Sequence, residues 1–123
     1  MATGTINTIP DLKDYYFSAP NAIVSRATIL NGGYLKFGAL VIVHVKIKAV
    51  GSASNSPGIL RDFPRPRIDA ALTAIDITSG MTSAITSGVP CGITDNSNTG
   101  FVYIKETTND HIYAITGCYI TAD

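Results

Sequence analysis

The clearest feature of the chain is an alternation of apolar and other positions over residues 39–49. With the two-residue period of a β-strand, one face of this segment carries only branched apolar side chains, those of Val41, Val43, Val45 and Ile47. The other face begins apolar and becomes cationic, with Leu40, Ile42, His44, Lys46 and Lys48. This gradient predicts a strand whose two faces are both covered by other parts of the protein at one end, whereas one face is exposed to solvent at the other end.

Other segments share this period and predict short strands, at residues 22–30, 70–78, 89–94, 101–106 and 112–121. Residues that favour turns separate several of them, namely Asn31-Gly32-Gly33, residues 95–100 and residues 108–111. We expect the last of these to close a hairpin. No segment has the apolar stripe of an amphipathic helix longer than two turns.

Residues 22–123 are therefore predicted to form an all-β domain, an antiparallel β-sandwich or jelly-roll-like fold. Residues 1–21 are polar and end in an aromatic run, so we interpret them as a leader or linker that docks through Tyr15, Tyr16 and Phe17. Residues 50–58 predict a flexible loop. Residues 61–67 contain two prolines and predict an extended segment along an edge or over the surface.

Composition adds one expectation. Charged residues make up 15% of the 123 residues, against about 25% in ordinary soluble domains. A domain of this size with so few ionised side chains is expected to cover part of its surface with copies of itself. We therefore expect an oligomer.

Charge and hydropathy exclude several classes of partner. The 9 basic and 9 acidic side chains give a net charge of zero, which excludes a basic nucleic-acid surface and a polybasic membrane patch. No apolar run approaches the roughly 18 residues of a membrane span, so no membrane insertion is expected. The first ten residues lack the features of a secretory signal, so we expect synthesis in the cytosol.

Catalytic and cofactor signatures are missing from the sequence, and no cofactor is expected. His44 and His111 have no third ligand at a metal-binding spacing, so no metal site is expected. We expect His44 at a surface or interface, and His111 either in a turn or at a ligand. Glycoside hydrolysis needs two paired carboxylates, but Glu106 is the one glutamate and Asp95 and Asp110 fall in predicted turns. The chain is not expected to be an enzyme.

The two cysteines, Cys91 and Cys118, are too few for a disulfide scaffold and do not form a CxxC motif. Both have apolar or glycine neighbours, which favours free, buried thiols. A disulfide between neighbouring strands is the alternative.

Candidate binding residues are polar side chains at the predicted turns, because a stiff sheet presents such groups to a ligand. They are Asp95, Asn96 and Asn98 in one turn, and Asn109, Asp110 and His111 in the other. Arg65 and Arg67 flank Pro66. Their guanidinium groups either point outward together and bind a ligand, as a binding fork, or stabilise a surface loop. The strand tyrosines Tyr103, Tyr113 and Tyr119 are expected to pack across strands with their hydroxyls at a wet edge.

The stretch Gly33-Tyr34-Leu35-Lys36-Phe37-Gly38, followed directly by a valine-rich strand, is similar to a recurrent pattern in phage tail proteins. A proline-containing segment follows at 57–67, and the chain closes with a Gly-aromatic-Ile strand at 117–120. Over residues 20–123 this order resembles the C-terminal receptor-binding modules of phage and prophage tail-fibre and baseplate proteins. The resemblance implies a β-sandwich that forms a homotrimer about its long axis and exposes loops to host cell-surface saccharides.

The expected function is thus a non-catalytic adhesion module at the virion tail that binds host carbohydrate, with weak sites combined through avidity. A structural tail or baseplate subunit that packs against other virion proteins is the alternative. A third hypothesis, a small glycan-degrading enzyme, would depend on Glu106, Asp95 and Asp110.

Overall fold

The structure is a computed structural model, and it describes residues 18–80 and 88–123. This part of the chain folds into eight β-strands with no α-helix among them, which confirms the predicted antiparallel all-β fold. The strands are β1 (Asn21–Ala22), β2 (Ala27–Phe37), β3 (Leu40–Ala49), β4 (Gly58–Phe63), β5 (Ala70–Asp76), β6 (Gly88–Asn96), β7 (Thr99–Ile104) and β8 (Ile112–Ile120). Within the described ranges there is no helix that could span a membrane.

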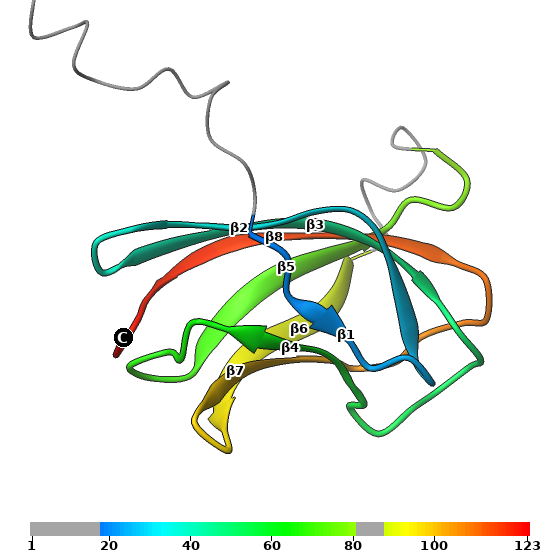
Figure 1. Ribbon diagram of the computed structural model, residues 1–123. Helices are drawn as coiled ribbons and strands as arrows, with labels where there is room; N and C mark the ends of the chain where they lie inside the picture. Colours follow the sequence, from blue (N-terminus) through cyan, green and yellow to red (C-terminus); the bar gives the residue numbers. More distant parts are fainter. Residues whose placement is uncertain (1–17, 81–87) are drawn as a thin grey trace, which may run out of the picture.

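All eight strands belong to one sheet, in the order β1-β4-β7-β6-β5-β8-β3-β2. The sheet curves into a nearly closed barrel, with β2, β3, β8 and β5 along one wall and β1, β4, β7 and β6 along the other (Figure 1). The seam is spanned by residues 18–22. Ser18 exchanges two backbone hydrogen bonds with Tyr34 of β2, at 2.8 and 3.1 Å, while Asn21 and Ala22 pair with β4.

The alternation in β3 produces the core. The side chains of Val41, Val43, Val45 and Ile47 are at most 1% exposed, while the polar residues of the other face point to solvent. Together with them, the inward residues of the other strands fill the barrel, among them Ile59, Leu60, Ile93, Val102, Ile104 and Ile115. Burying these branched side chains stabilises the fold by about 1.5–3 kcal/mol each.

The predicted turn at Asn31-Gly32-Gly33 is wrong. These residues lie inside β2, where the pairing with β3 shifts between Ile29 and Asn31. Gly32 follows this β-bulge, pairs with Val45 of β3 and has a φ of +82°, a use of glycine within a strand that the sequence does not distinguish from a turn. The turn into β3 comes instead at Gly38, with a φ of +58°. The strand predicted at 22–30 is likewise divided by a turn before Ala27.

The hairpin predicted at 108–111 is also wrong. β7 pairs with β4 and β6, whereas β8 pairs with β3 and β5, so the two strands are not neighbours. The connection crosses one end of the barrel and bonds to the loop after β3, through Ala53 and Thr107 and through Ala49 and Asp110. Turn-forming residues set the local backbone and do not determine which strands pair.

The turn predicted at 95–100 is correct. Ser97 and Asn98 have φ values of 57° and 64°, as a two-residue hairpin turn between β6 and β7 requires. The segment predicted to be extended at residues 61–67 begins in β4, which contains Arg61 and Phe63. In the sheet order, β4 lies next to the short edge strand β1. Pro64 and Pro66 follow the end of β4. The aromatic run Tyr15, Tyr16 and Phe17 lies outside the described residues.

The two cysteines are free. Cys91 faces the core from β6, and burial raises the pKa of its thiol to about 12, against a weaker opposing effect of the Gly92 backbone. Cys118 is exposed on the outer face of β8, so the prediction of a buried thiol is wrong there. In the alternation of β8, Tyr113, Ile115 and Tyr119 point inward, which places Cys118 on the outer face.

Candidate functional site

The candidate residues chosen from the sequence lie at two opposite ends of the barrel. The arginines and the β6–β7 turn are at the end where β8 finishes, and residues 109–111 are at the end where β8 begins. At about 3.3 Å per residue, the nine residues of β8 separate the two groups by roughly 30 Å. They therefore cannot form a single site.

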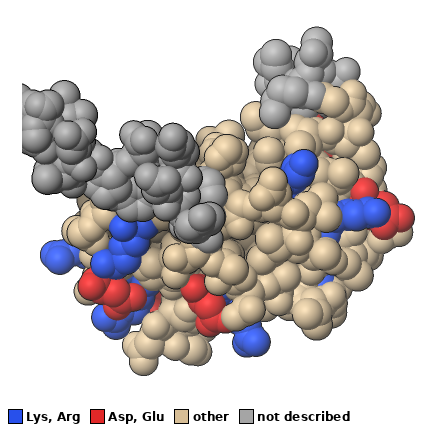
Figure 2. Space-filling view, turned by 45° about the horizontal axis from the view of Figure 1, so that its top comes forward, with Lys and Arg blue, Asp and Glu red and all other residues tan. Residues whose placement is uncertain are grey.

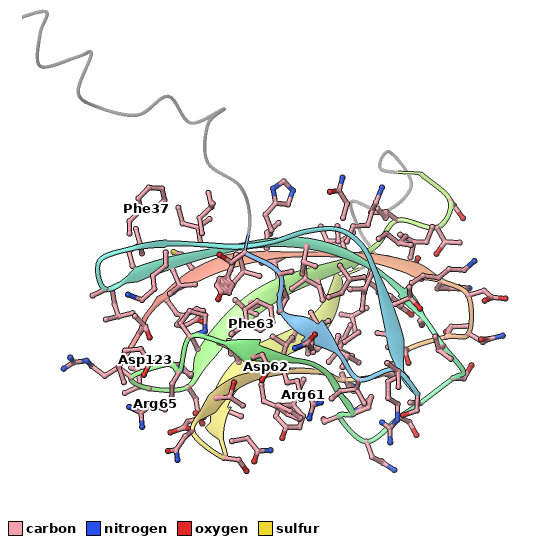
Figure 3. The ribbon with its side chains drawn as sticks, in the orientation of Figure 1. Phe37, Arg61, Asp62, Phe63, Arg65 and Asp123 are labelled. Carbon is pink, nitrogen blue, oxygen red and sulfur yellow. The ribbon has the colours of Figure 1, made fainter. Side chains whose placement is uncertain are left out.

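Arg65 and Asn98 are brought together, and Figure 3 shows Arg65 near Asp123. Arg65 Nη1 donates to Asn98 Oδ1 at 3.4 Å, and Nη2 lies 3.4 Å from a carboxylate oxygen of Asp123. The Arg65 backbone carbonyl accepts bonds from Thr121 Oγ1 and Ala122 N. This arginine joins the turn to the end of the chain, which favours the stabilising role over the binding fork.

Arg67 and Asp95 are exposed near this same end. Arg67 donates its backbone N–H to Ile120 at 2.9 Å, so its backbone, too, is held to β8. Neither side chain has a hydrogen bond or ion pair in the described part of the chain. Asn96, by contrast, donates from Nδ2 to the Tyr103 hydroxyl of the neighbouring strand β7 at 2.8 Å.

At the other end, Asn109 and Asp110 serve the backbone. Asn109 Oδ1 accepts the Gly51 N–H at 2.8 Å, and the Asn109 N–H donates to Ser52 Oγ at 2.9 Å. Asp110 has a φ of 65° and donates its N–H to Ala49. Both residues hold the crossing connection against the loop after β3, which is a structural role.

His111 forms a short contact with the end of β5. Its Nδ1 lies 2.6 Å from Asp76 Oδ2, where a ring N–H donates to the carboxylate. The other oxygen of Asp76 accepts from both the hydroxyl and the backbone N–H of Thr78, at 2.5 and 3.0 Å. Burial alone would raise the pKa of Asp76, but the hydrogen bonds from Thr78 and His111, with the charge of His111, lower it below 3.8.

This network predicts an acid-sensitive stability. Because the Asp76 pKa is lower in the folded protein, its contribution is present above pH 4 and is lost as the pH falls through the lowered value. We expect Asp76→Asn to reduce the free energy of unfolding by about 1–2 kcal/mol at pH 7, and the difference from the unsubstituted protein to shrink at pH 3. Urea denaturation at the two pH values measures this. Asp95→Asn, an exposed control, is expected to change neither value, and a pH-independent Asp76→Asn effect would contradict the prediction.

A groove runs over the outer face of β5, β6 and β7. In the sheet register Ala71, Gly92 and Tyr103 lie side by side across the three strands. Gly92 forms the floor of the groove because it has no side chain. The Tyr103 side chain projects outward along one side, which we call the aromatic bank, whereas the small Ala71 side chain on the other side projects little. The hollow between them has a volume of about 350 Å³.

The Tyr103 ring is held in place from two directions. Phe101, two residues before it on the same face of β7, packs against it with ring centroids 5.4 Å apart. Asn96 Nδ2 donates to the Tyr103 hydroxyl at 2.8 Å. Gly58 of β4 leaves room for Phe101, since a Cβ at that position would lie 2.9 Å from the ring. The groove therefore has a preorganised aromatic bank.

Polar groups are concentrated at one end of this hollow. Asp69, just before β5, accepts the Thr94 hydroxyl at 2.5 Å through Oδ1. The second carboxylate oxygen of Asp69 has no hydrogen-bond partner among the described residues, and the Tyr103 hydroxyl keeps its own proton to donate. An apolar ring face beside unpaired acceptors and donors is suited to a ligand with one apolar face and several hydroxyls.

None of the binding residues predicted from the sequence lines this groove, and Asn96 only contacts the hydroxyl of Tyr103. Tyr103 is predicted from the sequence as a packing residue, and Asp69, Thr94 and Gly92 are not indicated by it. Small residues on adjacent strands beside an outward aromatic are a usable signal, but only after the register of β5, β6 and β7 is known.

Among the described residues, no three His, Cys, Asp or Glu side chains gather into a group that could hold a metal ion. Comparisons of the chain with protein-family models, with curated proteins and with solved structures find no match.

Proposed function

We propose that this protein is a non-catalytic adhesion module of a phage or prophage virion tail, which binds host cell-surface carbohydrate in the Tyr103 groove. The observation that carries the proposal is the fixed Tyr103 ring above a glycine floor, with Asp69 and Thr94 at its end. A sugar ring can place its C–H face on the aromatic ring and its hydroxyls on the Asp69 carboxylate and the Tyr103 hydroxyl.

A binding role without hydrolysis is supported by the charge content of the groove. Among the described residues that line it, the one acidic side chain is that of Asp69. Glycoside hydrolysis by the usual mechanism requires two carboxyl groups on opposite sides of the scissile bond. Glu106, Asp95 and Asp110, which an enzymatic hypothesis would use, are outside these linings.

A sandwich-like homotrimer is the assembly that we propose for this module. The outer faces of β3 and β8 carry an apolar patch, formed by Leu40, Ile42, Cys118 and Ile120. Leu40 is 38% and Ile120 49% exposed in the single chain, although the sequence pattern predicts a covered end for this part of β3. Figure 2 shows charged side chains in small groups separated by wide uncharged surface, which supports coverage by sister copies.

Binding to an array of bacterial surface polysaccharides, with the oligomeric mass measured by light scattering on the same sample, tests the proposal. We expect binding to a subset of glycans, a trimeric mass and no release of shorter sugars. An intact protein that binds none of the glycans overturns it. If such a protein instead binds to other purified tail components, it is a structural tail or baseplate subunit.

A further inference from the structure

The groove does not end at Gly92. A second hollow of about 400 Å³ lies on the other side of this residue, and the two hollows share Gly92 and Tyr103. Its remaining lining includes Ser56 from the loop before β4, Pro90 of β6 and Lys105 after β7. From Pro90 to Thr94 the combined groove follows β6 for about 13 Å, at 3.3 Å per residue. This length accommodates more than one sugar ring.

The two ends of the combined groove differ in charge. Asp69 provides a carboxylate at the first end, whereas Lys105 provides an ammonium group at the second. The Lys105 side chain is exposed and forms no ion pair within residues 18–80 and 88–123, although Glu106 is its neighbour in sequence. No acidic side chain lines the second hollow to neutralise it.

The Lys105 position is fixed by its backbone. Its N–H donates to the Pro90 carbonyl at 2.8 Å, and its carbonyl accepts from Ser56 N at 3.0 Å. Pro90 lies across the second hollow from Lys105, and it has no N–H and only a short apolar side chain. It therefore presents no charged group that would compete with Lys105 for a ligand. The Lys105 side chain, which carries the ammonium group, thus extends from a fixed backbone position on the rim of the second hollow.

We propose that the groove binds a linear acidic glycan, with an uncharged sugar beside Asp69 and an anionic group, a uronate carboxylate or a phosphodiester, beside Lys105. This inference rests on the proposed function and adds the chemical class of the ligand. The Asp69 carboxylate repels an anion at the first hollow, which fixes the direction in which the glycan lies. The anionic unit therefore binds only at the Lys105 end of the groove.

Titration calorimetry with three probes tests the inference: an oligogalacturonate, its carboxyl-reduced neutral counterpart and a poly(glycerol phosphate). We expect an acidic probe to bind more tightly than the neutral one. The Lys105→Gln variant should lose about fivefold in affinity for the acidic probe, as one exposed ion pair contributes up to about 1 kcal/mol, and should bind the neutral probe unchanged. Lys105→Arg should retain the preference, and Lys48→Gln, on the outer face of β3, is the matched control.

The probes also separate the possible failures. Preference for oligogalacturonate identifies a carboxylate as the anionic group, and preference for the phosphate polymer identifies a phosphodiester. Tighter binding of the neutral sugar, or an equal loss for all probes in Lys105→Gln, overturns the acidic-glycan inference and leaves the proposed function standing. Absence of binding to these probes and to the whole array overturns both.

Discussion

Gly32→Ala is expected to destabilise the protein by about 3–5 kcal/mol, at the upper end of single-substitution effects. A Cβ at this position would lie 2.0 Å from the His44 carbonyl oxygen, which belongs to the backbone of β3 and cannot rotate away. The φ of +82° adds about 1–2 kcal/mol of strain for any residue with a Cβ. The clash can be relieved only by separating β2 from β3 at Gly32.

Chemical denaturation of purified Gly32→Ala and Gly38→Ala measures this effect. Gly38 also has a positive φ, of +58°, but a Cβ there meets no atom within 4 Å. The control therefore carries the conformational cost alone, about 1–2 kcal/mol, and the difference between the variants isolates the collision with His44. Equal stabilities for the two variants would show that the bulge in β2 is able to relax.

Tyr103→Ala is expected to reduce affinity for the proposed glycan ligand by more than about tenfold, since a central aromatic side chain commonly contributes 2 kcal/mol or more to binding. The substitution removes the aromatic bank that both hollows share. Tyr103→Phe keeps the ring and loses only the hydroxyl that Asn96 contacts, so it should keep most of the affinity. Calorimetry with the best glycan from the array measures both variants.

Phe37→Ala provides the control for general effects of removing an outer aromatic. Figure 3 shows Phe37 above the wall formed by β2, β3 and β8, on a different side of the barrel from β7. It should bind the glycan like the unsubstituted protein. A thermal melt of each variant checks that it is folded, and a folded Tyr103→Ala variant with full affinity would move the proposed site away from this groove.

The strands that the sequence predicts best are those with strict alternation. In β3 and β8 the period of two correctly separates Val45 and Ile115 in the core from Lys46 and Thr116 outside it. The β6–β7 turn is correctly predicted because Ser97 and Asn98 adopt the positive φ values that short polar side chains tolerate. These features depend on neighbours in sequence.

The errors concern features set by distant residues. Whether Asn31 and Gly32 turn the chain or continue a strand after a bulge depends on the β3 backbone that faces them. Likewise, Asn109 does not lie at the tip of a hairpin where it could bind a ligand, because the connection after β7 crosses the barrel and Asn109 bonds to Gly51. The groove requires three strands in a particular register, so no local pattern could identify Tyr103 as its bank.

The unequal surroundings of the two thiols have a practical consequence. Cys118 shares the apolar patch with Leu40 and Ile120, while Cys91 has a pKa raised to about 12 and stays protonated at neutral pH. An alkylating reagent at neutral pH therefore modifies Cys118 with little background from the second sulfur. Its reaction rate, followed from dilute to concentrated solution, will slow if sister copies cover that patch and stay constant if they do not.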